Sequence, residues 1–190
     1  MRRTIMMLAM LGLAAGMAGC LGGGKGPGGS KIVVRVSAAA ERDYVDVDGA
    51  VWTADQVWAE GKKWGAIGGE TVRRLDLKVA KGVKAPEVYL TERYGMTGYR
   101  FDLPNGRYAL RLHFAETYDG IKAAGERVFS VKVQGNVVLK DLDIFKATGK
   151  LAAPLVKEIA DVSVTDGKLM IEFVENVQNP EINGIEIFAH

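Results

Sequence analysis

Aromatic side chains beside amide and carboxylate side chains are the residues of this sequence with the clearest chemical potential. Tyr118 precedes Asp119, Tyr94 precedes a glycine, and Gln178 and Asn179 precede a proline. A sugar ring has an apolar C–H face and a rim of hydroxyl groups, so aromatic rings and planar hydrogen-bonding groups bind it together. The pattern favours carbohydrate binding, and packing is the alternative for each single ring. For Trp52 and Trp58, packing is the preferred interpretation.

Paired carboxylates could instead hydrolyse a glycosidic bond. Glu92 and Glu116 fall at what we expect to be opposite ends of a strand pair, and a glycosidase needs two carboxyl groups at a fixed separation. The preferred interpretation is structural: hydrogen bonds at strand ends to backbone N–H groups, Arg93 or Arg127. His113 lies in a strand pattern, and without a Gly-x-Ser-x-Gly motif it gives little support to nucleophilic catalysis. We predict a protein that is not an enzyme.

Metal-binding patterns are weak. One cysteine and two histidines do not make an ordinary zinc site, which takes three or four nitrogen or sulfur ligands. Asp43, Asp46 and Asp48 are close together, but they lack the spacing and terminal glutamate of an EF-hand. An aspartate-rich turn is the default interpretation, a structural calcium ion is the alternative, and no cofactor is predicted.

The N-terminus has the pattern of a secretory signal. Arg2 and Arg3 precede a short apolar run that ends in Met-Ala-Gly before Cys20, and this ending resembles the bacterial lipobox. We expect a signal peptide over residues 1–19, lipidation of Cys20, a glycine-rich tether over residues 20–30 and a domain over residues 31–190. The predicted location is the bacterial cell envelope, anchored to a membrane by lipid. An ordinary signal peptide with an incidental cysteine is the alternative.

The charge balance gives no support to nucleic-acid binding. Of the 25 lysines and arginines, Arg2 and Arg3 lie in the predicted signal peptide, which leaves 23 against 23 acidic residues. Nucleic-acid binding needs a basic surface that displaces counterions.

Alternating apolar residues predict an all-β fold. Short strands are expected at residues 31–37, 73–79, 98–103, 107–114, 127–133, 137–139, 156–164, 169–174 and 182–188, with an irregular stretch over residues 38–69. Turn residues join several of these strands, and a hairpin is expected at residues 165–167. No ten-residue segment has a helical period. The pattern indicates a β-sandwich with jelly-roll topology.

Four blocks of sequence, in order, resemble the malectin family: VYLTERYG, GRYALRLHFAETYDG, RVFSVKVQGNVVLKDLDIF and NPEINGIEIF. The resemblance extends from Ile32 to Phe188. It implies a β-sandwich of galactose-binding-like topology that binds carbohydrate without modifying it. In animal malectin the ligand is a glucose disaccharide, so the partner expected here is a glycan or oligosaccharide, with glucose-containing ones as candidates.

Carried over by motif, the resemblance implies that Tyr94 and Tyr118 stack on the sugar, with Trp64 as a third, loosely aligned aromatic residue. Asp119 stands where the family often has an aromatic residue, and Gln178 stands where the eukaryotic form has aspartate. Together with Asn179, these two are expected to bind hydroxyl groups. Because both positions differ, the alternative is a protein–protein or structural module of an envelope complex that uses the same loops.

Overall fold

The computed structural model describes residues 29–190. The predicted signal peptide, Cys20 and all but the last two residues of the predicted tether lie outside these residues. Within residues 29–190, no helix is long and apolar enough to span a membrane.

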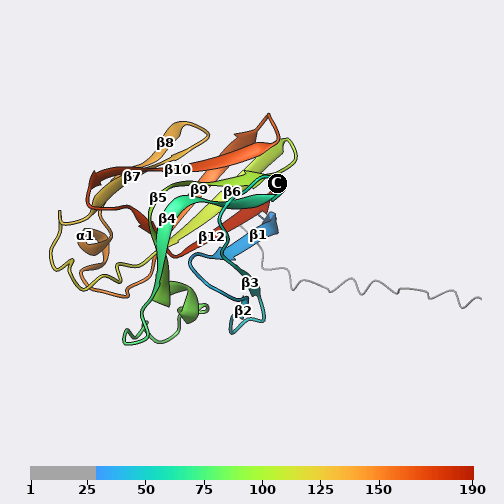
Figure 1. The fold of residues 1–190 in the computed structure, drawn as a ribbon. Helices are drawn as coiled ribbons and strands as arrows, with labels where there is room; N and C mark the ends of the chain where they lie inside the picture. The colour runs from blue at the N-terminus through green and yellow to red at the C-terminus, as the bar shows by residue number, and fades with distance from the viewer. Residues whose placement is uncertain (1–28) are drawn as a thin grey trace, which may run out of the picture.

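Two six-stranded sheets pack face to face and confirm the predicted β-sandwich; Figure 1 shows them as two layers. The first sheet has the order β2 (Tyr44–Val45), β3 (Val51–Ala54), β1 (Lys31–Ser37), β12 (Gly184–Ala189), β6 (Gly106–Phe114) and β9 (Leu155–Val164). The second has the order β11 (Glu181–Ile182), β5 (Thr91–Asp102), β10 (Lys168–Val177), β7 (Val128–Val133) and β8 (Asn136–Leu142), and β4 (Trp64–Arg73) also pairs with β5. All these pairs are antiparallel except that between β1 and β3.

The core lies between the two sheets and follows the alternation in the sequence. In β6, Leu110, Leu112 and Phe114 are fully buried, and β12 contributes Ile185 and Ile187. They meet apolar side chains of the second sheet, including Tyr99, Phe101, Phe129, Leu169 and Ile171.

The segment from residue 64 to residue 79 differs from the prediction. Strand β4 covers residues 64–73, of which residues 64–69 were expected to be irregular, and no strand forms at residues 74–79, where Leu75 is 78% exposed. The sequence pattern did not predict β4 because three of its residues are glycines, and glycine weakens the alternation that indicates a strand. The fold requires at least two of them: a Cβ atom at Gly65 would lie 2.3 Å from the backbone nitrogen of Trp58, and one at Gly69 would lie 2.8 Å from that of Met96.

Two turns connect one sheet to the other. Turn residues in the sequence do not show whether a turn stays within one sheet or crosses to the second. The turn at residues 165–167 joins β9 of the first sheet to β10 of the second, so the predicted hairpin is wrong. Residues 103–105 likewise join β5 to β6 across the sandwich. The start of β5 and the end of β6 therefore lie at the same end of the sandwich, so the expectation that Glu92 and Glu116 lie at opposite ends is also wrong.

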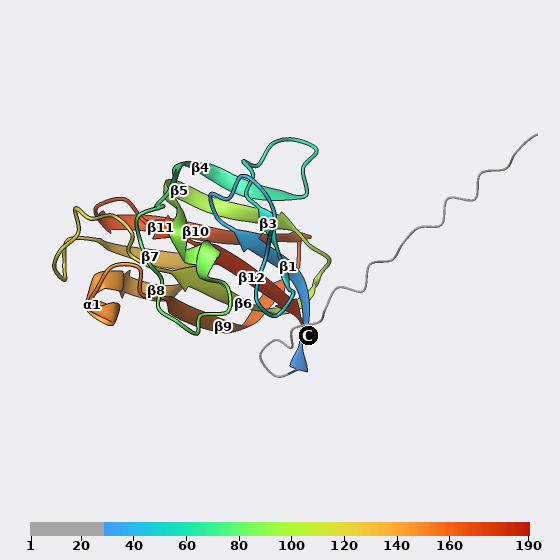
Figure 2. The same ribbon diagram turned by 90° about the horizontal axis from the view of Figure 1, so that it is seen from below.

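That end carries the longer loops and two short helices. Residues 115–127 connect β6 to β7, α1 (Ile144–Thr148) follows β8, and the 3₁₀ helix η2 (Pro86–Leu90) precedes β5. In both views, α1 and residues 115–127 lie away from the C-terminus (Figure 1, Figure 2). The candidate site is built from the loops at this end.

Candidate functional site

Four of the six residues predicted to bind ligand line one depression of about 380 Å³. Tyr94 comes from β5, Tyr118 from the loop after β6, and Gln178 and Asn179 from the turn between β10 and β11. The remaining lining residues are Val72, Arg74, Glu92 and Arg127. The fold thus brings together two aromatic rings and two amide side chains from distant parts of the chain.

Buried charge holds the loop that carries Tyr118. Glu116 is fully buried; its Oε1 accepts a hydrogen bond from the Tyr118 backbone N–H at 3.0 Å, and its Oε2 lies 3.0 Å from Nε of Arg127. Burial raises the pKa of Glu116, although the Arg127 guanidinium opposes this. Glu92, 2% exposed, accepts a hydrogen bond from the Thr117 hydroxyl group. Glu116 thus has the partners that the structural interpretation expects, a backbone N–H group and Arg127, whereas the partner of Glu92 is a side-chain hydroxyl group.

A third carboxyl group, Glu181, lies in the same cluster. It is fully buried, and neither of its oxygens has a hydrogen-bond partner within the described chain. Burial raises the pKa of Glu181 well above its ordinary value, and the charge of Glu92 acts in the same direction. The Arg127 charge opposes the upward pKa shifts of both Glu116 and Glu181.

The turn with Gln178 and Asn179 has a constrained backbone. Gln178 adopts a left-handed conformation with φ of 63°, which is uncommon for a residue other than glycine. Its side-chain oxygen accepts the Asn179 N–H at 3.0 Å, and the Gly95 N–H donates to the Pro180 carbonyl at 2.9 Å. The turn is thus tied to β5 beside Tyr94.

Trp64 and Asp119 do not line this depression. Trp64 pairs with Phe101, whereas Glu70 pairs with Tyr94, so about 20 Å of strand separates the two levels at about 3.4 Å per residue. The Trp64 ring stacks on Phe101 with centroids 5.9 Å apart, which corrects the prediction that it shares a site with Tyr94. Asp119 is exposed next to Tyr118 but is not among the lining residues.

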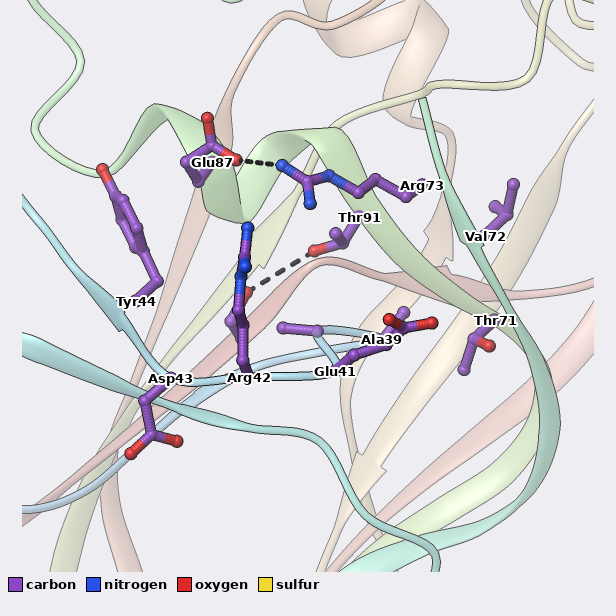
Figure 3. A pocket seen from close by; sticks show the side chains of 12 residues that line it. Ala39, Glu41, Arg42, Asp43, Tyr44, Thr71, Val72, Arg73, Glu87 and Thr91 are labelled. Carbon is purple, nitrogen blue, oxygen red and sulfur yellow. Dashed lines mark hydrogen bonds and ion pairs between the residues drawn. The ribbon is translucent and has the colours of Figure 1, made fainter. Parts of the chain in front are cut away.

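A larger depression of about 610 Å³ lies near the ends of β1 and β4 (Figure 3). Its charged side chains have both signs, and Arg73 and Glu87 already form an ion pair at 2.8 Å. Tyr44 is the one aromatic residue that lines it. Without a second ring to hold a sugar face, it fits the predicted chemistry less well than the smaller depression.

His113 is buried, with 7% of its surface exposed. Its Nδ1 lies 2.7 Å from the Tyr89 hydroxyl oxygen, its Nε2 lies 3.1 Å from Glu186, and its ring packs edge-on against Trp52. Burial raises the pKa of Glu186, but the hydrogen bonds and charges of His113 and Arg35 lower it by more, so the net shift of the pKa is downward. The network joins a loop cluster around Trp52 to the first sheet, and this role is structural.

In the aspartate-rich turn, the carboxylates of Asp46 and Asp48 already have hydrogen-bond or ion-pair partners within the protein. Asp46 accepts the backbone N–H groups of Asp48 and Ala50 and the indole N–H of Trp52, while Asp48 pairs with Lys84. No group of three or more metal-ligating side chains occurs in residues 29–190. The calcium alternative gains no support from this geometry.

Sequence reasoning missed Val72 and Arg74, and it read Arg127 only as a structural partner. A strand was expected at residues 73–79, but β4 ends at Arg73 and the next residue, Arg74, lines the depression. The expected strand would have continued past this point, so the sequence did not place Arg74 in the site. No local signal in the sequence marks the end of β4 there.

Comparison with known proteins identifies the family. Residues 32–185 match the Malectin domain. Malectin-A of Xenopus laevis is 34% identical over 75% of this chain, and human malectin is 31% identical over 95%. The chain spans 49% of the frog protein and 64% of the human one. A Bacteroides uniformis β-glucuronidase has a region with the same fold, with a TM-score of 0.72 at 24% identity over 83% of this chain and 18% of the enzyme. The chain belongs to the malectin-domain family.

Proposed function

We propose that this protein binds a glycan, without modifying it, in the depression between Tyr94 and Tyr118. The observation that carries the proposal is the convergence of these two rings with the Gln178 and Asn179 amides. Tyr118 is 41% exposed and can offer ring surface to a sugar, while the amides supply donors and acceptors for hydroxyl groups. Membership of the malectin-domain family supports the same function.

Loss of either ring is expected to weaken binding by about five-fold or more, because one stacked aromatic contributes roughly 1–3 kcal/mol. A glycan array that includes gluco-oligosaccharides, followed by titration calorimetry, compares the wild type with Tyr94→Ala and Tyr118→Ala. Tyr44→Ala, in the larger depression, is the matched control and should bind as the wild type does. Absence of binding to any oligosaccharide, or equal loss in Tyr44→Ala, would contradict the proposal.

Gly120 offers a test that removes no contact group. A Cβ atom there would lie 2.3 Å from a carbon of the Tyr118 ring. Gly120→Ala should therefore displace the ring and weaken glycan binding by about five-fold or more. The control is Gly106→Ala, whose Cβ would meet Tyr108 at 3.7 Å, an ordinary contact. Equal affinities of both variants and the wild type would argue against a role for Tyr118.

We further propose that the domain is held at the bacterial cell envelope by lipid on Cys20. The apolar run before this cysteine and the glycine-rich stretch after it support the proposal. Cys20→Ser should prevent incorporation of labelled palmitate and move the protein from the membrane fraction to the soluble fraction of bacterial cells. An unchanged distribution would contradict lipid anchoring.

A further inference from the structure

Two guanidinium groups line the depression beside its aromatic rings. Arg127 is 4% exposed; its charge faces Glu116, yet its Nε and Nη1 atoms are buried without a hydrogen bond to any described residue. Arg74 lies over the Tyr118 ring, with its Cζ atom 5.7 Å from the centroid. The Nε atom of Arg74 is also buried without a hydrogen-bond partner among residues 29–190.

Arg74 is the cation of the site that has no ion pair. Within the described part of the chain, no carboxylate lies within 4.0 Å of its guanidinium nitrogens, whereas the neighbouring Arg73 pairs with Glu87. Glu92 also lines the depression, but it is buried and accepts the Thr117 hydroxyl. The formal charges around the depression nearly balance, so net charge does not make the site prefer an anionic ligand. The preference follows from the position of Arg74, which lines the depression next to the Tyr118 ring and has no ion pair within the described residues.

A guanidinium group with free N–H groups is suited to a carboxylate, because its planar fork donates two parallel hydrogen bonds to the two oxygens. A neutral sugar that covered Arg74 would remove water from the charge and offer only uncharged hydroxyl acceptors in its place. A sugar that carries a carboxylate would satisfy the charge and could still place a C–H face against the tyrosines.

We propose that the ligand is an acidic oligosaccharide in which the carboxylate of a uronic acid residue binds Arg74. This inference rests on the proposed glycan-binding function. Arg127 lies below as a second, buried positive charge that is held in place by Glu116. Arg74 is then the residue that determines specificity, while Tyr94 and Tyr118 provide affinity for the ring.

The test uses the full-length chain and two matched ligands. Tetrasaccharides that contain glucuronate or galacturonate are titrated before and after chemical reduction of their carboxyl groups to primary alcohols. The affinity for the acidic form should be at least about ten times the affinity for the reduced form, and added salt should reduce this ratio. Arg74→Gln should abolish the difference, and Arg73→Gln should preserve it. Circular dichroism verifies that both variants are folded.

The outcomes separate the two proposals. If both forms bind equally and Tyr118→Ala abolishes binding, glycan binding stands and the acidic preference is wrong. If the preference survives in Arg74→Gln, its assignment to Arg74 is wrong. If neither these ligands nor neutral oligosaccharides bind, both proposals fail.

Discussion

Asp55→Ala is expected to destabilise the domain by about 3–5 kcal/mol, the usual cost of removing one partner of a buried ion pair. The Asp55 carboxylate lies 2.7 Å from Nε of Arg93, and both side chains are at most 5% exposed. The same carboxylate accepts hydrogen bonds from the Tyr99 hydroxyl at 3.1 Å and the Ala39 N–H at 2.8 Å. Without it, the Arg93 charge would remain buried, and Ala39, two residues beyond the end of β1, would lose the hydrogen bond that links it through Asp55 to β5.

Denaturant unfolding of Asp55→Ala and Asp48→Ala measures this effect against a surface pair. Asp48 pairs with Lys84, but the two side chains are 52% and 74% exposed. Solvent screens such a pair, so its loss should cost much less stability than the loss of the buried Asp55 carboxylate. Similar losses in the two variants would show that the Asp55 network contributes no more than a surface contact.

Asp55 illustrates what the sequence predicts well and what it does not. Alternation of apolar residues predicts strands such as β1 and β6 because burial of one face imposes a period of two. Whether a connection stays in one sheet or crosses to the other depends on packing partners far away in sequence. The hairpin expected at residues 165–167 failed for this reason, and an aspartate in an apparently irregular stretch gave no sign of its buried partner.

The candidate site shows the same division. Residue types that suit a sugar identified Tyr94, Tyr118 and the two amides, and the fold brings all four to one depression. The sequence did not show that Trp64 lies far from Tyr94, because its position depends on the register of β4 against β5. The glycines of β4 leave no pattern from which this register could be predicted. Arg74 was missed because an arginine in an alternating pattern is ordinarily a solvated side chain.

Glu181→Gln is expected to stabilise the domain at alkaline pH. Glu181 is fully buried on β11, opposite Tyr94 of β5, and both of its oxygens lack hydrogen bonds within residues 29–190. Its pKa is raised well above 4.5 by burial and by the charge of Glu92, so the folded protein holds the Glu181 proton to a higher pH than the unfolded chain does. Glutamine has nearly the same shape and cannot ionise, so it should substitute for the protonated form.

The sign of the pH dependence follows from this raised pKa. Below about pH 4.5 Glu181 is protonated in both states, and its favourable contribution to stability is complete. As the pH rises, the unfolded chain releases the proton first, so stability falls by up to about 1.4 kcal/mol for each pH unit until the folded state also ionises. Urea unfolding from pH 4.5 to pH 9 should therefore show the wild type and Glu181→Gln with similar stability at the acidic end and a growing advantage for the variant above it. Glu175→Gln, an exposed substitution on β10, should keep the wild-type slope. Parallel curves for wild type and Glu181→Gln would mean that Glu181 is ionised in the folded protein, with Arg127 neutralising its charge.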